Sequence, residues 1–218
     1  MAAIVVANGV LPDLVLFGPL LDAADMIVAA NGGARALMHA GRRPTAILGD
    51  LDSLPPDLLA TWRAGGGETL VFPPEKDETD LELALRYVLQ RGACRIAVLG
   101  ALGGRVDHEL ANLLLLAAPL LDGIAATVLD RHTRVVAVRD EIELAGRTGD
   151  LLSLLPVTAA ATGIVTEGLA YRLNGETLLL GPARGVSNVF LQERIAVRLA
   201  AGVLLAIHTW PDDRLLEW

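Results

Sequence analysis

The clearest local pattern in the chain is IAVLGALGGRVDH, residues 96–108. A short apolar run typical of a buried strand leads into three glycines, and a helical pattern starts near Arg105 and continues to Leu116. A strand followed directly by a glycine-rich turn and a helix is typical of a parallel sheet with crossover helices. The glycines also permit close backbone approach and leave main-chain amides for a phosphate, or they simply shape the turn.

The same alternation of strand and helix patterns extends outward over the first half of the chain. The clearest helix begins after Thr79, which forms a capping box with Glu82, and stops at Gly92. Further apolar runs, too short and unalternating for surface strands, predict strands buried on both faces at residues 4–7, 26–29, 46–48, 69–71 and 127–129. The first half is therefore predicted to be α/β, with a mostly parallel sheet flanked by helices.

Beyond this half the helical period fades. Residues 195–199 alternate between larger apolar and small or polar side chains, as in a half-buried strand. Asn174-Gly175 predicts a tight hairpin turn, and Ala201-Gly202 predicts a second one. We expect a smaller antiparallel β-sandwich here, and we place the two domains at residues 1–131 and 132–218.

Composition excludes several classes of function. The 218 residues carry 18 Lys and Arg against 26 Asp and Glu, a net charge of −8, which disfavours nucleic acid and anionic membranes as partners. The longest apolar run, residues 113–121, is far shorter than the roughly 20 residues that span a bilayer. Cys94 is the only cysteine, which excludes an intrachain disulfide, and no signal peptide is apparent. We expect a cytoplasmic protein.

Carboxylates follow a predicted strand at Asp50 and Asp52. Residues two apart on an extended chain project to the same side, so both carboxylates are expected at the carboxyl end of the strand. Ligands bind at this edge of an open α/β sheet, and paired carboxylates there suit a hard cation such as magnesium. The alternative is that both residues only shape a turn.

Two further segments carry charge near predicted helix starts. EKDETD, residues 75–80, contains the only lysine, Lys76, which suits a phosphate as a point charge or is present by chance. Asp77 and Asp80 in the same segment either act at the site or only complement the helix dipole. NGGAR, residues 31–35, repeats the order of strand, glycines and helix and forms a second plausible phosphate cradle.

Several common catalytic motifs are absent. A P-loop cannot occur, because Lys76 has no glycine before it and no Ser or Thr after it, and no Gly-x-Gly-x-x-Gly turn is present. His108-Glu109 begins a zinc-protease pattern, but Asn112 stands where the second histidine is required. No Gly-x-Ser-x-Gly nucleophile elbow exists. A site built from carboxylates and glycine-rich turns is what remains.

Taken in order, five segments resemble the thiamine pyrophosphokinase family: residues 31–34, 49–53, 76–80, 103–108 and 187–188. The resemblance spans both halves of the chain. It implies an ATP-binding α/β catalytic domain, a thiamine-binding β-sandwich and a homodimer that holds thiamine between subunits. The implied reaction transfers the β,γ-pyrophosphoryl group of ATP to the thiamine hydroxyl, giving thiamine diphosphate and AMP, and it requires Mg²⁺.

The resemblance also implies site residues. It assigns Mg²⁺ to Asp50, Asp52 and Asp80, and adds Asp107 to these as a fourth candidate catalytic carboxylate. The expected thiamine contacts are Ser187, Asn188 and Tyr171, although core packing or a cross-strand pair explains Tyr171 slightly better. The residues expected to bind ATP are Asn31, Gly32, Gly33, Lys76, Asp77, Gly103, Gly104, Arg105 and His108.

One position departs from the pattern, because many members of the family have aspartate where this chain has Asn31. The change removes a carboxylate from the implied site. Two alternative functions therefore remain at this point. One is a pyrophosphokinase for another heterocyclic alcohol such as a hydroxymethylpterin, against which Ser187 and Asn188 argue. The other is a nucleotide- or thiamine-binding protein without catalysis, and the carboxylates that argue against it are the retained Asp50, Asp52, Asp80 and Asp107.

Overall fold

The structure is a computed structural model that describes residues 1–11 and 14–212. It divides into two compact units, each considered separately below. Among the described residues, the first comprises Met1–Leu115 and Leu120–Asp130, and the second comprises Leu116–Pro119 and residues 131–212. The last six residues of the expected second domain, 213–218, lie outside the described residues.

The first unit contains six parallel strands in the order β6-β5-β1-β2-β3-β4. All six predicted strands are confirmed to within two residues at each end. Their apolar runs do not alternate because the central strands are buried on both faces. The bounds are β1 Ala2–Val6, β2 Met26–Ala30, β3 Ala46–Gly49, β4 Glu68–Val71, β5 Arg95–Leu99 and β6 Ala125–Asp130.

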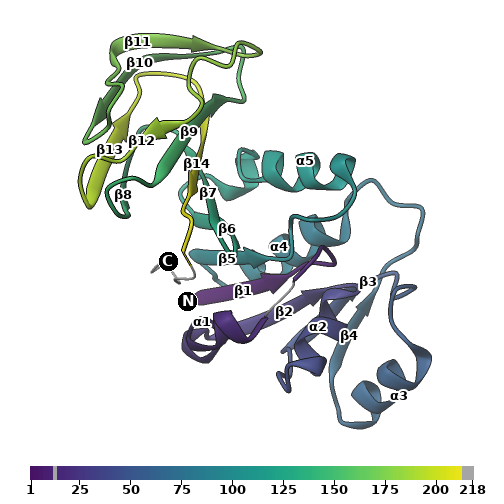
Figure 1. Cartoon of the computed structure of the whole chain (residues 1–218). Helices are drawn as coiled ribbons and strands as arrows, with labels where there is room; N and C mark the ends of the chain where they lie inside the picture. The colour runs from purple at the N-terminus through teal and green to yellow at the C-terminus, as the bar shows by residue number, and fades with distance from the viewer. Residues whose placement is uncertain (12–13, 213–218) are drawn as a thin grey trace. The chain divides into compact units, whose positions relative to one another are not determined.

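Helices connect the parallel strands (Figure 1). The longest is α4, whose predicted cap is confirmed: Thr79 Oγ1 accepts a hydrogen bond from the Glu82 amide at 3.2 Å. Its apolar face, including Leu81, Leu85 and Val88, is buried. The helical bounds are η1 Leu14–Phe17, α1 Gly18–Ala23, α2 Gly33–His39, α3 Pro56–Ala64, α4 Asp80–Gln90, α5 Val106–Leu115 and η2 Pro119–Leu121. No helix in the described part of the chain is long and apolar enough to span a membrane.

The strand order reverses at β1. Successive strands β1 to β4 add on one side, whereas β5 and β6 add on the other. The loops that leave β1 and β5 therefore diverge at their carboxyl ends, which is where open α/β sheets bind ligands. These two loops stay in contact for a few residues, since Gly9 N donates to Gly100 O at 2.7 Å. A Cβ atom at Gly9 would lie 2.4 Å from the same oxygen, so only glycine fits.

In the second unit, four antiparallel strands of the ten-stranded sheet lie in the order β12-β9-β14-β7, and a separate four-stranded antiparallel sheet has the order β11-β10-β13-β8. Both sheets contribute to one apolar core around Phe190, Leu154 and Ile164, which confirms the predicted sandwich. The bounds are β7 Thr133–Val138, β8 Glu141–Ala145, β9 Leu151–Pro156, β10 Ala160–Glu167, β11 Asn174–Leu179, β12 Asn188–Val189, β13 Arg194–Arg198 and β14 Leu204–Thr209.

Both predicted hairpin turns are wrong. Asn174 and Gly175 lie inside β11, where Asn174 pairs with Val165 at an irregularity in the register. The positive φ of Gly175, 79°, serves that irregularity rather than a two-residue turn. Ala201-Gly202 does lie in a turn, but the strands on either side, β13 and β14, belong to different sheets and do not pair.

Candidate active site

A cavity of about 720 Å³ opens at the carboxyl edge of the parallel sheet in the first unit. Its walls come from the loops after β1, β2, β3 and β5, from the segment before α4 and from the start of α5. The reversal of strand order at β1 creates this opening. The predicted site residues that line it are Asn31, Asp50, Asp52, Lys76, Asp77, Asp80, Gly104, Arg105 and His108.

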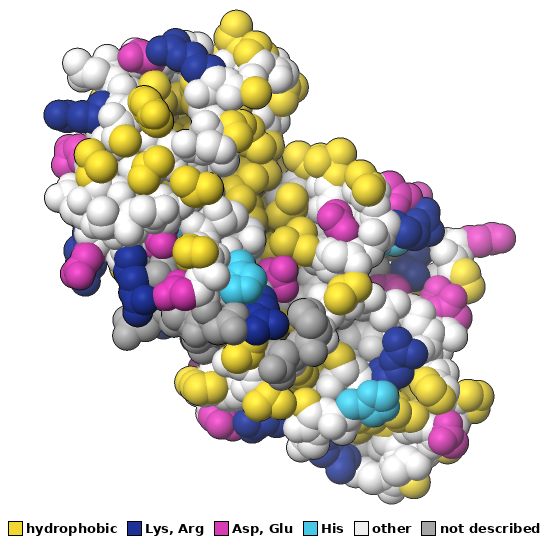
Figure 2. All heavy atoms as spheres, in the orientation of Figure 1, with side chains coloured by type: hydrophobic (Ala, Val, Ile, Leu, Met, Phe, Trp, Pro, Cys, Tyr) yellow, Lys and Arg dark blue, Asp and Glu magenta, His cyan; other side chains and the backbone are white. Residues whose placement is uncertain are grey.

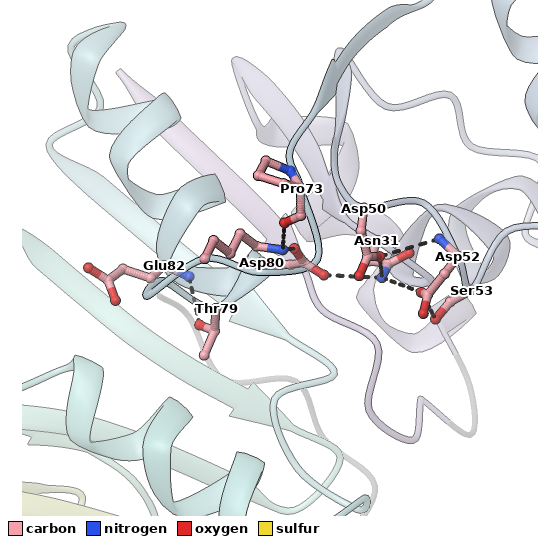
Figure 3. Close-up of polar contacts among 9 residues, drawn as sticks. Asn31, Asp50, Asp52, Ser53, Pro73, Thr79, Asp80 and Glu82 are labelled. Atoms are coloured by element: carbon pink, nitrogen blue, oxygen red, sulfur yellow. Dashed lines mark hydrogen bonds and ion pairs between the residues drawn. The ribbon is translucent and has the colours of Figure 1, made fainter.

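Three carboxylates meet at one amide nitrogen in this cavity. Asn31 Nδ2 lies 2.8 Å from Asp50 Oδ1, 3.0 Å from Asp52 Oδ1 and 3.1 Å from Asp80 Oδ2. Figure 3 shows the four side chains turned toward one another. Asn31 follows β2, the two aspartates Asp50 and Asp52 follow β3, and Asp80 is the first residue of α4. The sheet edge therefore brings together residues that are 49 positions apart.

The backbone around this cluster is unusual. Asn31 has φ 47° and Leu51 has φ 65°, both in the left-handed region that non-glycine residues rarely adopt. Asparagine tolerates that region better than most residues, whereas Leu51 is strained there. Between them Gly49 has φ 140°, and a Cβ atom there would lie 3.0 Å from Asp80 Cγ. The tight packing of backbone against carboxylate explains the glycine.

The charge on Asp52 is stabilised by its neighbours. The Asn31 amide, then the Ser53 hydroxyl and then Asp50 lower the pKa of Asp52 below its usual value. The Ser53 hydroxyl donates to Asp52 Oδ1 at 3.0 Å. Hydrogen bonds to the ionised form thus outweigh the small cost of desolvation, and the carboxylate is negative at neutral pH.

The single lysine lies against this cluster. Lys76 Nζ pairs with Asp80 Oδ1 at 3.0 Å and also donates to Pro73 O at 3.3 Å. The lysine side chain is only 12% exposed, so both contacts are largely shielded from solvent. Lys76 therefore neutralises part of the negative charge at the cavity wall while remaining close to any ligand bound there.

The start of α5 contributes further charged residues to the cavity wall. Arg105 donates two hydrogen bonds to the Asp107 carboxylate, from Nη2 at 2.6 Å and from Nε at 3.2 Å. This pairing lowers the pKa of Asp107. Asp107 is turned to that arginine and does not line the cavity, whereas Arg105 and His108 do. Glu109 Oε1 accepts from the Gly104 amide at 2.6 Å. The Gly104 amide, which the sequence predicts to be available to a phosphate, is thus already hydrogen-bonded to the Glu109 carboxylate.

Three predicted glycines lie outside this cavity. Gly32 lines a neighbouring hollow of about 580 Å³ together with Arg35 and His39. A Cβ atom at Gly33 would meet Val6 O at 2.1 Å, so that glycine lets α2 approach β1. Gly103, with φ 80°, forms the turn after β5.

The three predicted thiamine-contacting residues meet in the second unit. Asn188 Nδ2 donates to Tyr171 O at 2.7 Å, and Asn188 Oδ1 accepts from Tyr171 N at 2.9 Å. Tyr171 as a whole is 71% exposed. Ser187, next to Asn188, has φ 61° and donates from its amide to Ser153 Oγ at 3.1 Å. The segment around Tyr171 and the segment around Asn188, which are distant in sequence, are thus joined by hydrogen bonds.

The polar residues that line the cavity and were not predicted as site residues include Asn8, Glu109 and Asn112. Asn8 follows β1 at its carboxyl end, and that position was the available signal. Its side chain lies over Gly32, where a Cβ atom would be 2.0 Å from Asn8 Oδ1. Asn112 donates to Ala101 O at 2.9 Å and holds α5 to the loop after β5. Nothing in the sequence alone distinguishes it from any other helical asparagine.

Comparison with known proteins bears on both units. Residues 17–128 match the family described as "Thiamin pyrophosphokinase, catalytic domain", and residues 139–204 match "Thiamin pyrophosphokinase, vitamin B1 binding domain". The chain belongs to the thiamin pyrophosphokinase family. Family membership confirms the resemblance seen in the sequence. The first matched region lies in the first compact unit except for residues 116–119, and the second matched region lies in the second unit.

Relatives of similar length agree with this membership. The chain is 27% identical to a thiamine pyrophosphokinase of Bacillus subtilis, with 94% of this chain and 97% of the relative covered. It is 28% identical to thiamine pyrophosphokinase 3 of Oryza sativa subsp. japonica, covering 91% and 83%. A crystal structure of thiamine pyrophosphokinase from Bacillus subtilis superposes with a TM-score of 0.84 at 25% identity, covering 96% of this chain and 99% of that one.

Proposed function

We propose that this enzyme transfers the β,γ-pyrophosphoryl group of ATP to the hydroxyl of thiamine, with thiamine diphosphate and AMP as products. The observation that carries the proposal is the convergence of Asp50, Asp52 and Asp80 on one cavity in the catalytic domain of this family. In the reaction the thiamine oxygen forms a bond to the β-phosphorus. The bond from that phosphorus to the oxygen bridging to the α-phosphorus breaks, AMP leaves with that oxygen, and the hydroxyl proton is released.

The donor set suits Mg²⁺. Three aspartates supply the hard, anionic oxygens that this ion prefers. Asn31 Nδ2 lies where the three carboxylates converge, and Asn31 Oδ1 is buried without a hydrogen-bond partner, so the polar groups of this cluster are not fully satisfied by the chain alone. In the described residues, no group of three or more His, Cys, Asp or Glu side chains is already arranged to hold a metal ion, so the three aspartates would have to move to bind one. Asp50, Asp52 and Asp80 would hold the ion, which when bound neutralises charge on the phosphates.

The cationic residues would bind and orient the phosphates. Lys76 is held beside Asp80 at 3.0 Å, which positions a point charge at the cavity wall. Arg105 is 75% exposed and paired only on the surface with Asp107, so little free energy opposes its turning toward a phosphate. Asp77 and His108 line the same cavity and complete the proposed ATP contacts. Phosphoryl-type transfer depends mainly on such positioning and charge neutralisation rather than on a strong base.

In the second unit, Ser187, Asn188 and Tyr171 are proposed to contact thiamine. This part of the chain belongs to the vitamin B1 binding domain of the family. The exposed Tyr171 ring offers an aromatic face to the cationic thiazolium. Asn188, which is buried and bonded to the Tyr171 backbone, positions that ring's loop.

The test is a product analysis. The purified chain is incubated with ATP, Mg²⁺ and thiamine, and in parallel with a hydroxymethylpterin instead of thiamine, and products are identified by mass. We expect thiamine diphosphate and AMP in the first tube only. AMP formed only with the pterin would move the substrate to another alcohol. No product from a folded sample that binds ATP would contradict catalysis altogether.

A homodimer with thiamine near the subunit interface is the proposed assembly. Its physical support is α5, whose Val106, Leu110 and Leu114 form an apolar stripe that is 79%, 57% and 43% exposed. Figure 2 shows hydrophobic side chains gathered over this helix. A second copy of the chain is the proposed cover. Sedimentation velocity is expected to show a dimer that Leu110→Glu dissociates, and a wild-type monomer would contradict the assembly.

The proposed location is the cytoplasm. ATP is abundant there, and a chain whose only cysteine is unpaired needs no oxidising compartment. Fractionation of the source cells should recover the activity with the cytoplasmic fraction, and recovery with the membranes would contradict the proposal.

A further inference from the structure

Asn31 makes an unusual set of hydrogen bonds. Its Nδ2 atom carries two hydrogens but lies within hydrogen-bond distance of three carboxylates, at 2.8, 3.0 and 3.1 Å. At least one hydrogen is therefore shared between two acceptors. Asn31 is only 7% exposed, so water competes little for these contacts.

The orientation of this amide follows from charge. Turning the amide over would place Oδ1 against three carboxylate oxygens, which repel it. With Nδ2 inward, Oδ1 is left buried without a hydrogen-bond partner, an unfavourable state for a polar atom. The carboxylates thus impose an arrangement that leaves the other end of the amide unsatisfied.

The negative charge of the three carboxylates is only partly neutralised. Within the described part of the chain, Lys76 is the one cation paired with any of these carboxylates. Three carboxylates and one ammonium group leave two negative charges, the amount that a divalent cation neutralises. The Asn31 amide supplies only partial positive charge, and it lies at the point where the three carboxylates converge (Figure 3).

We propose that Asn31 is a positioning residue that stands in for the divalent cation. In the metal-free enzyme its amide holds Asp50, Asp52 and Asp80 together, and a cation that binds these carboxylates must break the three hydrogen bonds. Asn31 therefore preassembles the site and lowers its affinity for metal. The inference rests on the carboxylate set of the proposed function, and it assigns to Asn31 a competition with metal.

Glycine is the sharpest substitution, because it removes the amide and suits the φ of 47° at this position. Binding of Mn²⁺ alone, without nucleotide or thiamine, is measured by calorimetry for the wild type, Asn31→Gly and Asn31→Asp. We expect Asn31→Gly to bind Mn²⁺ about tenfold more tightly than the wild type, and Asn31→Asp to bind it more tightly still, since it adds a charge. Asn112→Ala is the matched control, because its amide contacts only Ala101 O in the same cavity.

Melting temperature is the second readout. In EDTA, Asn31→Gly and Asn31→Asp are expected to melt below the wild type, because the amide no longer offsets part of the repulsion among the carboxylates. Mn²⁺ should raise their melting temperatures more than that of the wild type. If Asn31→Gly fails to fold, Asn31→Ala decides the question by Mn²⁺ binding, because it also removes the amide without adding a charge, and its backbone strain is the same with and without metal.

Unchanged or weaker Mn²⁺ binding by a folded Asn31→Gly variant would overturn the inference, as would the absence of saturable binding in every protein. An Asn31→Asp variant as stable as the wild type in EDTA would overturn it too. Failure here is separable from failure of the proposed function. An active wild type without this ranking contradicts only the role of Asn31, and an inactive wild type with the ranking contradicts only the function.

Discussion

Two buried asparagines organise the two candidate ligand regions, and they do so in opposite ways. Asn188 uses both ends of its amide on the backbone: Oδ1 accepts from Tyr171 N and Val189 N, each at 2.9 Å, and Nδ2 donates to Tyr171 O. Asn31 donates only to side-chain carboxylates and leaves Oδ1 unpaired. Asn188 therefore has both ends of its amide hydrogen-bonded and acts as a clamp between two segments of the backbone. The hydrogen bonds of Asn31 are an arrangement that a ligand is expected to change.

The two regions share one feature, which is strained backbone. Among the described residues, the non-glycine residues with positive φ are Asn31, Leu51 and Ser187, and all three lie in these two regions. Such conformations cost free energy and persist where the surroundings impose them, which is common at ligand sites. The contrast between the asparagines therefore concerns the two candidate ligand regions, and substitutions can test it.

The largest effect is expected from Asp52→Asn. Replacing this ionised carboxylate by an amide removes one anionic ligand of the carboxylate set, and we expect turnover to fall at least about a hundredfold while the fold and thiamine binding are kept. Steady-state rates and a thiamine titration measure the two effects. Asp57→Asn in α3, an exposed acid outside the cavity, is the control. Unchanged turnover would remove Asp52 from the site.

Asn188→Ala should act mainly on stability. The substitution leaves two backbone amides and one carbonyl without a partner, so we expect the free energy of unfolding to fall by about 1–3 kcal/mol. Denaturant titration measures this loss, and the KM for thiamine should rise because the Tyr171 loop is released. A variant as stable as the wild type would show that Asn188 is not a clamp, and the contrast with Asn31 would disappear.

Ser187→Ala should affect thiamine alone. Loss of one hydroxyl contact is expected to raise the KM for thiamine by about threefold to tenfold, with the KM for ATP unchanged. Ser187→Gly separates the hydroxyl from the backbone, because it removes the hydroxyl while relieving the strain at φ 61°. Equal effects of the two substitutions would assign the role to the hydroxyl. A fall in turnover without a change in KM would contradict the assignment.

The smallest effect is expected from Glu109→Gln. The Asn31 amide lies where a metal ion is proposed to bind, and the Glu109 carboxylate occupies the Gly104 amide in a similar way. Glu109 is therefore expected to compete with a phosphate oxygen for that amide. Removing its charge should lower the KM for ATP by about twofold to threefold, measured at fixed thiamine. A higher KM for ATP would mean that Glu109 supports the phosphate site rather than blocks it.

Local patterns predicted much of this molecule. The six parallel strands, the Thr79 cap of α4 and the change to an antiparallel sandwich follow from periodicity and turn chemistry, which act over a few residues. Those patterns failed where tertiary pairing overrode them. Asn174-Gly175 has the composition of a hairpin turn, yet the pairing of β10 with β11 takes both residues into a strand.

Local sequence is enough to predict which residues reach the carboxyl ends of the strands, because strand length and the glycines after each strand are local properties. Local sequence also predicts that Asp50 and Asp52 lie on one side of their loop. The position of Asn31 between these two residues and Asp80, and the contact of Asn188 with Tyr171, arise from tertiary contacts. Contacts of that kind depend on strand order and register, which set the distance between loops far apart in sequence and leave no periodic trace in any one of them.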